Sequence, residues 1–191
     1  MKKLISPFVA SLFLLAGCSS ITNTQVSSTG TNGSLKVGQS FDTELTYTDH
    51  EKNINGDISY YKIFTFNSGN RPPHSLKITS YHSMGGLGAL SSGNQFVYPA
   101  VVLKDKTQHT IVPRLVSRKA VAPGWVTSLS LETEWALQLK PREIYSLIVT
   151  SDNQANPASV KYRAVTASGP GLLINPVLKN GNTGKLEIQL N

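Results

Sequence analysis

The sequence predicts an all-β protein, a single β-sandwich or jelly-roll domain behind a disordered N-terminal segment. Short runs rich in aromatic and β-branched residues recur about every 10 to 20 residues along the chain. Clusters of Asn, Gly, Asp and Pro separate these runs, as is typical of sandwiches and jelly rolls. Only residues 131–139 have the composition of a helix, and we expect one or two turns there, ended by Pro141.

The first residues predict an export signal. Lys2 and Lys3 precede a mostly apolar stretch of about a dozen residues, which is too short to span about 30 Å of hydrocarbon as a helix. The stretch ends in Leu15-Ala16-Gly17-Cys18, which resembles the lipobox of bacterial lipoproteins. The resemblance implies that a peptidase removes residues 1–17 and that Cys18, the single cysteine of the chain, carries palmitate-like acyl chains as the mature N-terminus.

The residues after the cysteine indicate location and a linker. Ser19 follows Cys18, where lipoproteins of this kind that are retained at the inner membrane carry aspartate. The resemblance therefore implies a lipid anchor in the outer membrane of a Gram-negative cell, with the protein on the periplasmic face. Residues 18–34 are nearly all Ser, Thr, Asn, Gln and Gly, and they predict a flexible tether. Residues 35–191 then form the sandwich domain.

The charge composition argues against a nucleic-acid partner. The chain has 18 Lys and Arg against 11 Asp and Glu, a net charge of +7, and Lys2 and Lys3 leave with the signal. The remaining basic residues are spread along the sequence without a cluster, which predicts an ordinary solvated surface or one near anionic envelope polymers.

The individual strands are predicted from local pattern. Residues 60–66 (YYKIFTF) are rich in aromatic and β-branched residues, and residues 75–81 alternate with Leu76 and Ile78 on one face. Residues 96–103 form an apolar run interrupted by Pro99, which indicates a buried strand with an irregular start. The full set of expected strands is 41–47, 60–66, 75–81, 96–103, 109–112, 126–131, 145–150, 160–165 and 185–190.

The stretch 80–89, SYHSMGGLGA, raises the question of a serine hydrolase. It resembles the second half of the G-x-S-x-G nucleophile elbow, with Ser83 as the nucleophile. However, Tyr81 stands at the first glycine of that motif, and the glycines after Ser83 oppose the helix that must follow it. The single histidine downstream is His109, close to Asp105 and unlike a triad. We therefore expect a loop here, and no enzyme.

We expect neither a cofactor nor a metal. The histidines show no ligand spacing, and Asp49-His50-Glu51 indicates a polar turn. The Gly85-Gly86-Leu87-Gly88 run lacks the Lys-Ser/Thr that completes a phosphate-binding loop. Glu132 and Glu134 share a face only if their segment is a strand.

The order of the strands resembles a known family. The runs that carry the resemblance are 61–66, 76–81, 96–105 (FVYPAVVLKD), 139–150 (LKPREIYSLIVT), 171–173 and 184–188. Together they are similar to the β-sandwich of the maltose-operon periplasmic protein (MalM) family, which itself resembles bacterial pre-peptidase C-terminal domains. This chain lacks the long C-terminal extension of that family and adds a lipobox. The resemblance implies a non-enzymatic accessory protein of the envelope, linked to carbohydrate uptake or envelope glycans.

Aromatic residues and one glycine-rich loop are the candidate contacts for a ligand. Tyr98, Trp125 and Trp135 could stack on sugar rings or fill the core, and we favour the core for Trp135. The loop that contains Gly85, Gly86 and Gly88, rimmed by Tyr81 and Tyr98, is expected at one end of the sandwich, where recognition loops commonly lie. Two partners are open: a saccharide of the envelope, or a secretion or pilus assembly on which the chain docks through a sheet edge.

Overall fold

The fold is described from a computed structural model. It describes residues 31–54, 57–81, 95–122, 129–152, 154–156, 158–159, 162–166, 169–174 and 177–191. Every regular element in these ranges is a strand, so the all-β prediction is confirmed. No helix in this part of the chain is long and apolar enough to span a membrane.

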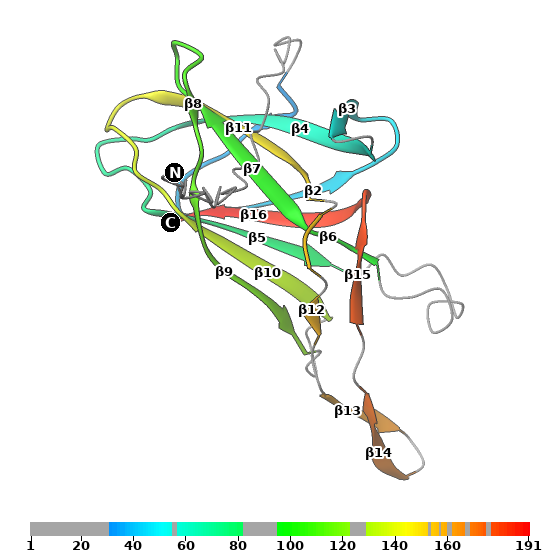
Figure 1. The fold of residues 1–191 in the computed structure, drawn as a ribbon. Coiled ribbons are helices and arrows are strands. Elements are labelled where there is room, and N and C mark those ends of the chain that lie inside the picture. The colour runs from blue at the N-terminus through cyan, green and yellow to red at the C-terminus, as the bar shows by residue number, and fades with distance from the viewer. Residues whose placement is uncertain are drawn as a thin grey trace, which may run out of the picture.

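Two sheets form a β-sandwich (Figure 1). The first sheet, which we call sheet A, has the order β1-β4-β11-β7-β8, with β3 also paired to β4. Its strands are β1 (Gly33–Ser34), β3 (His50–Ile54), β4 (Asp57–Asn67), β7 (Pro99–Lys104), β8 (Thr110–Ile111) and β11 (Ile144–Ser151). The second, sheet B, has the order β2-β16-β5-β10-β9. Its strands are β2 (Ser40–Leu45), β5 (Ser75–Tyr81), β9 (Arg114–Val121), β10 (Ser130–Ala136) and β16 (Gly184–Leu190).

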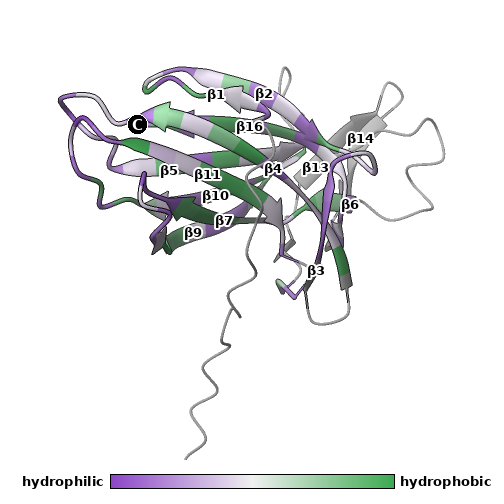
Figure 2. Cartoon of the chain, turned by 90° about the horizontal axis from the view of Figure 1, so that it is seen from above, coloured by the Kyte–Doolittle hydropathy of each residue, from purple (hydrophilic) through white to green (hydrophobic). Residues whose placement is uncertain are grey.

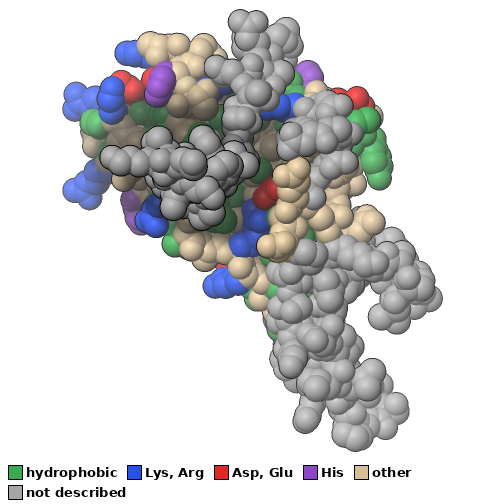
Figure 3. All heavy atoms as spheres, in the orientation of Figure 1, with side chains coloured by type: hydrophobic (Ala, Val, Ile, Leu, Met, Phe, Trp, Pro, Cys, Tyr) green, Lys and Arg blue, Asp and Glu red, His purple; other side chains and the backbone are tan. Residues whose placement is uncertain are grey.

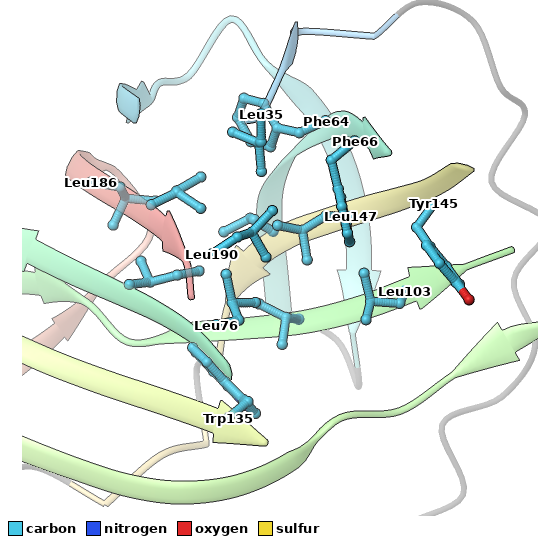
Figure 4. Close-up of a cluster of buried hydrophobic side chains, with 14 of the residues drawn as sticks. Leu35, Phe64, Phe66, Leu76, Leu103, Trp135, Tyr145, Leu147, Leu186 and Leu190 are labelled. Atoms are coloured by element: carbon cyan, nitrogen blue, oxygen red, sulfur yellow. The ribbon is translucent and has the colours of Figure 1, made fainter. Parts of the chain in front are cut away.

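Alternation along the strands builds the core between the sheets. In β16, for example, Leu186, Ile188 and Leu190 are buried whereas Lys185 is exposed. Figure 4 shows the resulting cluster, and Figure 2 shows apolar residues recurring along the strands of both sheets. The main core comprises Leu35, Leu45, Phe64, Phe66, Leu76, Ile78, Val97, Val101, Leu103, Trp135, Leu137, Tyr145, Leu147, Val149, Leu186, Ile188 and Leu190.

Pro99 divides the predicted strand 96–103 in two. Residues before it form β6 (Gln95–Val97), which pairs in parallel with β15 (Val177–Gly181), whereas β7 after it pairs with β11. A further strand, β12 (Ala158–Ser159), lies on the other side of β15. The hairpin of β13 (Tyr162–Thr166) and β14 (Gly169–Ile174) extends away from the sandwich (Figure 1).

Three expectations need correction. Of the helix expected at 131–139, residues 131–136 instead belong to strand β10, whose residues alternate so that Leu131, Thr133 and Trp135 are buried. The polar turn expected at Asp49-His50-Glu51 is only the approach to a strand, because His50 and Glu51 already pair with β4. The third concerns the end of the tether.

The folded domain begins before residue 35. Gly33 and Ser34 pair in parallel with Phe64 and Thr65, and the backbone N–H of Asn32 donates to the carbonyl of Ile63 (2.7 Å). The side-chain Oδ1 of Asn32 accepts from the N–H of Ile63 (2.8 Å). The last residues of the expected tether thus belong to sheet A.

Candidate binding site

The candidate site lies on the outer face of sheet B, around Tyr81. Tyr81 is the last residue of β5, and strand alternation places it on the face opposite Ile78 and Ser80. β5 pairs with β16, and β16 pairs with β2, so outward side chains of three strands lie side by side. The outward residues are polar or charged because this face is open to water.

Tyr81 is held by a carboxylate of the neighbouring strand. Its phenol oxygen donates to Oε2 of Glu187 at 2.5 Å. That hydrogen bond, together with partial burial, raises the pKa of Tyr81 to about 12. The same bond from Tyr81 holds the pKa of Glu187 below its ordinary value. The phenol therefore stays protonated, and the carboxylate stays charged, across the neutral range.

An open depression of about 710 Å³ surrounds this pair. Its walls come from β2, β16 and the end of β5: Ser40, Asp42, Thr43, Glu44, Tyr81, Lys185, Leu186 and Glu187. Carboxylates accept hydrogen bonds, the lysine donates them, and the tyrosine adds an aromatic surface. A few convergent polar groups around an aromatic ring suit a polyhydroxylated ligand.

A charged ladder continues across the same face. Glu132 of β10 accepts from Nζ of Lys77 on β5 at 2.8 Å, and its other oxygen lies 3.2 Å from Nζ of Lys119 on β9. Burial disfavours the charged carboxyl, but the two ammonium groups outweigh burial and hold the pKa of Glu132 below its ordinary value. This ladder ties three neighbouring strands of sheet B to one another beside the depression.

A second polar cluster links the two sheets beside Tyr98. The guanidinium carbon of Arg118 lies 5.5 Å from the centre of the Tyr98 ring, and Nη2 donates to the carbonyl of Pro99 at 3.1 Å. The same nitrogen lies 3.3 Å from Oδ2 of Asp152. Arg118 therefore ties the edge strand β9 to the start of β7, and its contacts are structural.

The predicted site residues fall in different places. Tyr81 lines the depression, whereas Tyr98 is fully buried in a small core with Phe96 and Leu131. Of the two interpretations of Tyr98, the structure therefore gives the core, and its ring offers no surface to a sugar. Trp135 is 5% exposed and packs in the main core, as expected.

The other candidates, Gly85, Gly86, Gly88 and Trp125, lie outside the described residues, as do Ser83 and Cys18.

Sequence reasoning missed the partners of Tyr81. Glu187 lies 106 positions from Tyr81 in the chain, and only the pairing of β16 with β5 brings them together. The alternation of Lys185, Glu187 and Gln189 with apolar residues did indicate an outward face of that strand. It did not indicate which strand lies beside it. Among the described residues, no three His, Cys, Asp or Glu side chains are grouped to hold a metal ion. The chain matches no protein-family model, no curated protein and no solved structure.

Proposed function

We propose that the chain is a non-enzymatic lipoprotein of the Gram-negative envelope that binds a saccharide in the depression beside Tyr81. The lipobox around Cys18 supports a membrane anchor at the periplasmic face of the outer membrane. The observation that carries the binding function is the Tyr81–Glu187 pair, which presents an aromatic ring, held in place by a hydrogen bond, among carboxylates and Lys185. Flat aromatic faces suit the C–H faces of sugars, and the carboxylates accept hydrogen bonds from hydroxyl groups.

The alternative function, docking of a secretion or pilus component at a sheet edge, has weaker support. One of the two edge strands of sheet B is β9, but its pairing with β10 shifts in register so that Leu115 faces Trp135 and Ser117 faces Glu134. Val116 is the extra residue of this bulge. Bulges and flanking Lys or Arg residues are devices that oppose the addition of another strand.

Binding of envelope glycans to Tyr81→Ala tests the proposal. Soluble peptidoglycan fragments and a glycan array are the probes, and Tyr47→Ala is the matched control because Tyr47 is an exposed tyrosine (74%) that does not line the depression. We expect Tyr81→Ala to lose binding and Tyr47→Ala to keep it. Equal binding by both variants, or a wild-type chain that binds no glycan, contradicts the proposal.

A further inference from the structure

The net positive charge of the chain is concentrated at one end of the sandwich. We call this end, formed by residues 35–39, 67–74, 104–114, 137–144 and 190–191, the basic end. Backbone hydrogen bonds join its turns: Gly38 donates to Leu190, His74 to Asn191 and Arg142 to Gly69. Seven basic residues lie here, namely Lys36, Arg71, Lys104, Lys106, Arg114, Lys140 and Arg142.

Only two acidic side chains share the basic end, and both are already occupied. Asp105 accepts hydrogen bonds from Thr107 and from the backbone N–H of His109. Glu143 accepts from the phenol of Tyr145 (3.1 Å). In the described part of the chain, none of the seven basic residues makes an ion pair, whereas Lys62, Lys77, Arg118 and Lys119 elsewhere each do. After Lys2 and Lys3 are set aside, the basic and acidic residues outside this end are equal in number.

The basic end and the first residues of β9 beside it together carry most of the exposed large apolar side chains of the described residues. Among the described residues, these exposed side chains are Val37, Tyr47, Ile58, Val112, Leu115, Val116 and Ile144. All of them except Tyr47 and Ile58 belong to the basic end or to the first residues of β9 beside it. Val112, at 64% exposed, lies between β8 and β9, two residues before Arg114. Figure 3 shows Lys and Arg side chains standing out on the side of the molecule where Figure 1 places the β7–β8 and β10–β11 turns.

We propose that the basic end docks on the anionic phospholipid surface of the membrane that anchors the chain. Unpaired cations attract an anionic surface, and exposed aliphatic side chains among them can enter the headgroup region. One acyl signal and one basic patch acting together is a recognised means of stable membrane attachment. This proposal rests on the proposed function, because the lipid anchor proposed there determines which membrane the basic end would meet.

The attachment point of the N-terminal segment is compatible with this orientation. The described chain enters at Asn32, beside Ile63, and β1 then runs toward the basic end, since it is parallel to β4. Asn67 ends β4 four residues beyond Ile63, a distance of about 13 Å at 3.3 Å per residue. The flexible tether that the sequence predicts would have an r.m.s. length of about 20 Å over the 13 residues from Cys18 to Gly30, which is enough to let the basic end reach the bilayer.

Vesicle flotation tests the proposal without the acyl chains. The probe protein is the chain from Ser19 onward, which contains every described residue, and the vesicles are phosphatidylcholine alone or mixed with phosphatidylglycerol. We expect flotation only with the mixed vesicles, and its loss at high salt. Lys106→Glu should weaken binding at least about fivefold, because each cation at such a surface contributes about that factor. The matched control is Lys52→Glu in β3, at the opposite end, which should bind like the wild type.

A fluorescent label reports which end touches the lipid. The chain from Ser19 has no cysteine, so Val112→Cys and Thr48→Cys each carry one environment-sensitive dye. We expect a blue shift on mixed vesicles at position 112 and none at 48. Equal losses in Lys106→Glu and Lys52→Glu, an unchanged dye at 112, or binding to soluble anionic polymers but not to vesicles would each overturn the proposal. These results do not depend on whether Cys18 is acylated. A failure of the proposed lipid anchor can therefore be distinguished from a failure of docking by the basic end.

Discussion

At the scale of single residues, the polar side chains of sheet B divide into partnered and unpartnered ones. On the outer face, Tyr81, Glu187 and Glu132 are all hydrogen-bonded or ion-paired. On the inner face, the hydroxyls of Ser80 and Thr133 are buried and have no hydrogen-bond partner. The first group links strands and shapes the depression, whereas the second costs stability because desolvated hydroxyls are left unsatisfied.

The Tyr81–Glu187 bond makes stability depend on pH in a defined direction. The pKa of Glu187 is lowered in the folded protein. Its contribution to the free energy of unfolding is therefore present above the ordinary carboxyl pKa and is lost as pH falls through the pKa of the folded protein. The pKa of Tyr81 is raised, so its contribution is lost only as pH rises through about 12. Tyr81→Phe should therefore cost up to about 1 kcal/mol at neutral pH, reduced by solvent screening, and much less in acid.

Urea unfolding at several pH values measures this difference. Tyr47→Phe is the control because no hydrogen bond of the Tyr47 phenol is found in the described structure, and it should track the wild type throughout. A constant difference between Tyr81→Phe and the wild type from neutral to acidic pH would show that the bond to Glu187 is not its source.

Thr133→Val should stabilise the protein. The substitution keeps the shape and β-branching of Thr133 but removes a hydroxyl that is fully buried and unpartnered. We expect a gain of about 1 kcal/mol in the free energy of unfolding. Thr133→Ser, which keeps the hydroxyl and removes the methyl group, should lose about 1 kcal/mol instead. A destabilised Val variant would indicate that the hydroxyl has a partner in solution.

At the scale of elements, two short strands pair with the edge of β4 that does not face β11. β3 pairs with residues 57–61 and β1 with residues 64–65. Asn32 covers the interval between them, because its backbone and side chain both bond to Ile63. Asn32 thus completes the hydrogen bonding of this edge of β4 at Ile63, between the residues that pair with β3 and those that pair with β1.

Removing that side chain should loosen the N-terminal strand. Asn32→Ala leaves the N–H of Ile63 without its 2.8 Å acceptor, and we expect a loss of about 1 kcal/mol in unfolding free energy. Amide exchange at Ile63 and Leu35 should accelerate more than exchange in β5. Thr31→Ala, one residue earlier and exposed, is the control and should change neither quantity.

Strand pattern predicted the central strands and failed at specific others. β4, β5, β11 and β16 were evident because buried faces impose alternation of apolar residues. β9 (RLVSRKAV) was missed because an edge strand with a bulge needs neither alternation nor apolar faces. Residues 131–139 were given a helix because Leu, Glu and Ala favour helices, but tertiary burial of every second residue overrides that preference.

At the scale of the whole molecule, the topology gathers charge that the sequence disperses. Lys36, Arg71, Lys106 and Lys140 are each about 35 positions apart, so no segment is rich in cations. Alternate crossings of the chain between the two sheets return all four to the same end. The sequence predicted an ordinary solvated surface or one near anionic envelope polymers, and no local pattern in it indicates that these cations gather at one end. The Tyr81 depression is equally non-local, since its walls come from the first and last strands of sheet B.

Membrane attachment should depend on Cys18. Cys18→Ser removes the sulfur that the proposed lipidation would modify, so the variant should accumulate as uncleaved precursor or leave the membrane fraction. Cell fractionation and the mass of the mature N-terminus measure both outcomes. Ser20→Ala is the control and should be processed and anchored normally. A Cys18→Ser protein of mature length that stays in the membrane would contradict lipidation.

The position of β1 also decides how the protein responds to mechanical tension. A pull on the N-terminal segment reaches the fold first at Asn32, which is held to Ile63, and then at Leu35, whose N–H donates to Thr65 at 2.8 Å. The next contact along the chain is the bond from Gly38 to Leu190. Rupture up to that point frees residues 32–37, about 20 Å of extended chain, while β4, β11 and β7 stay paired. We therefore expect β1 to act as an extensible link, because its pairing with β4 can break while the other strand pairs of sheet A stay intact.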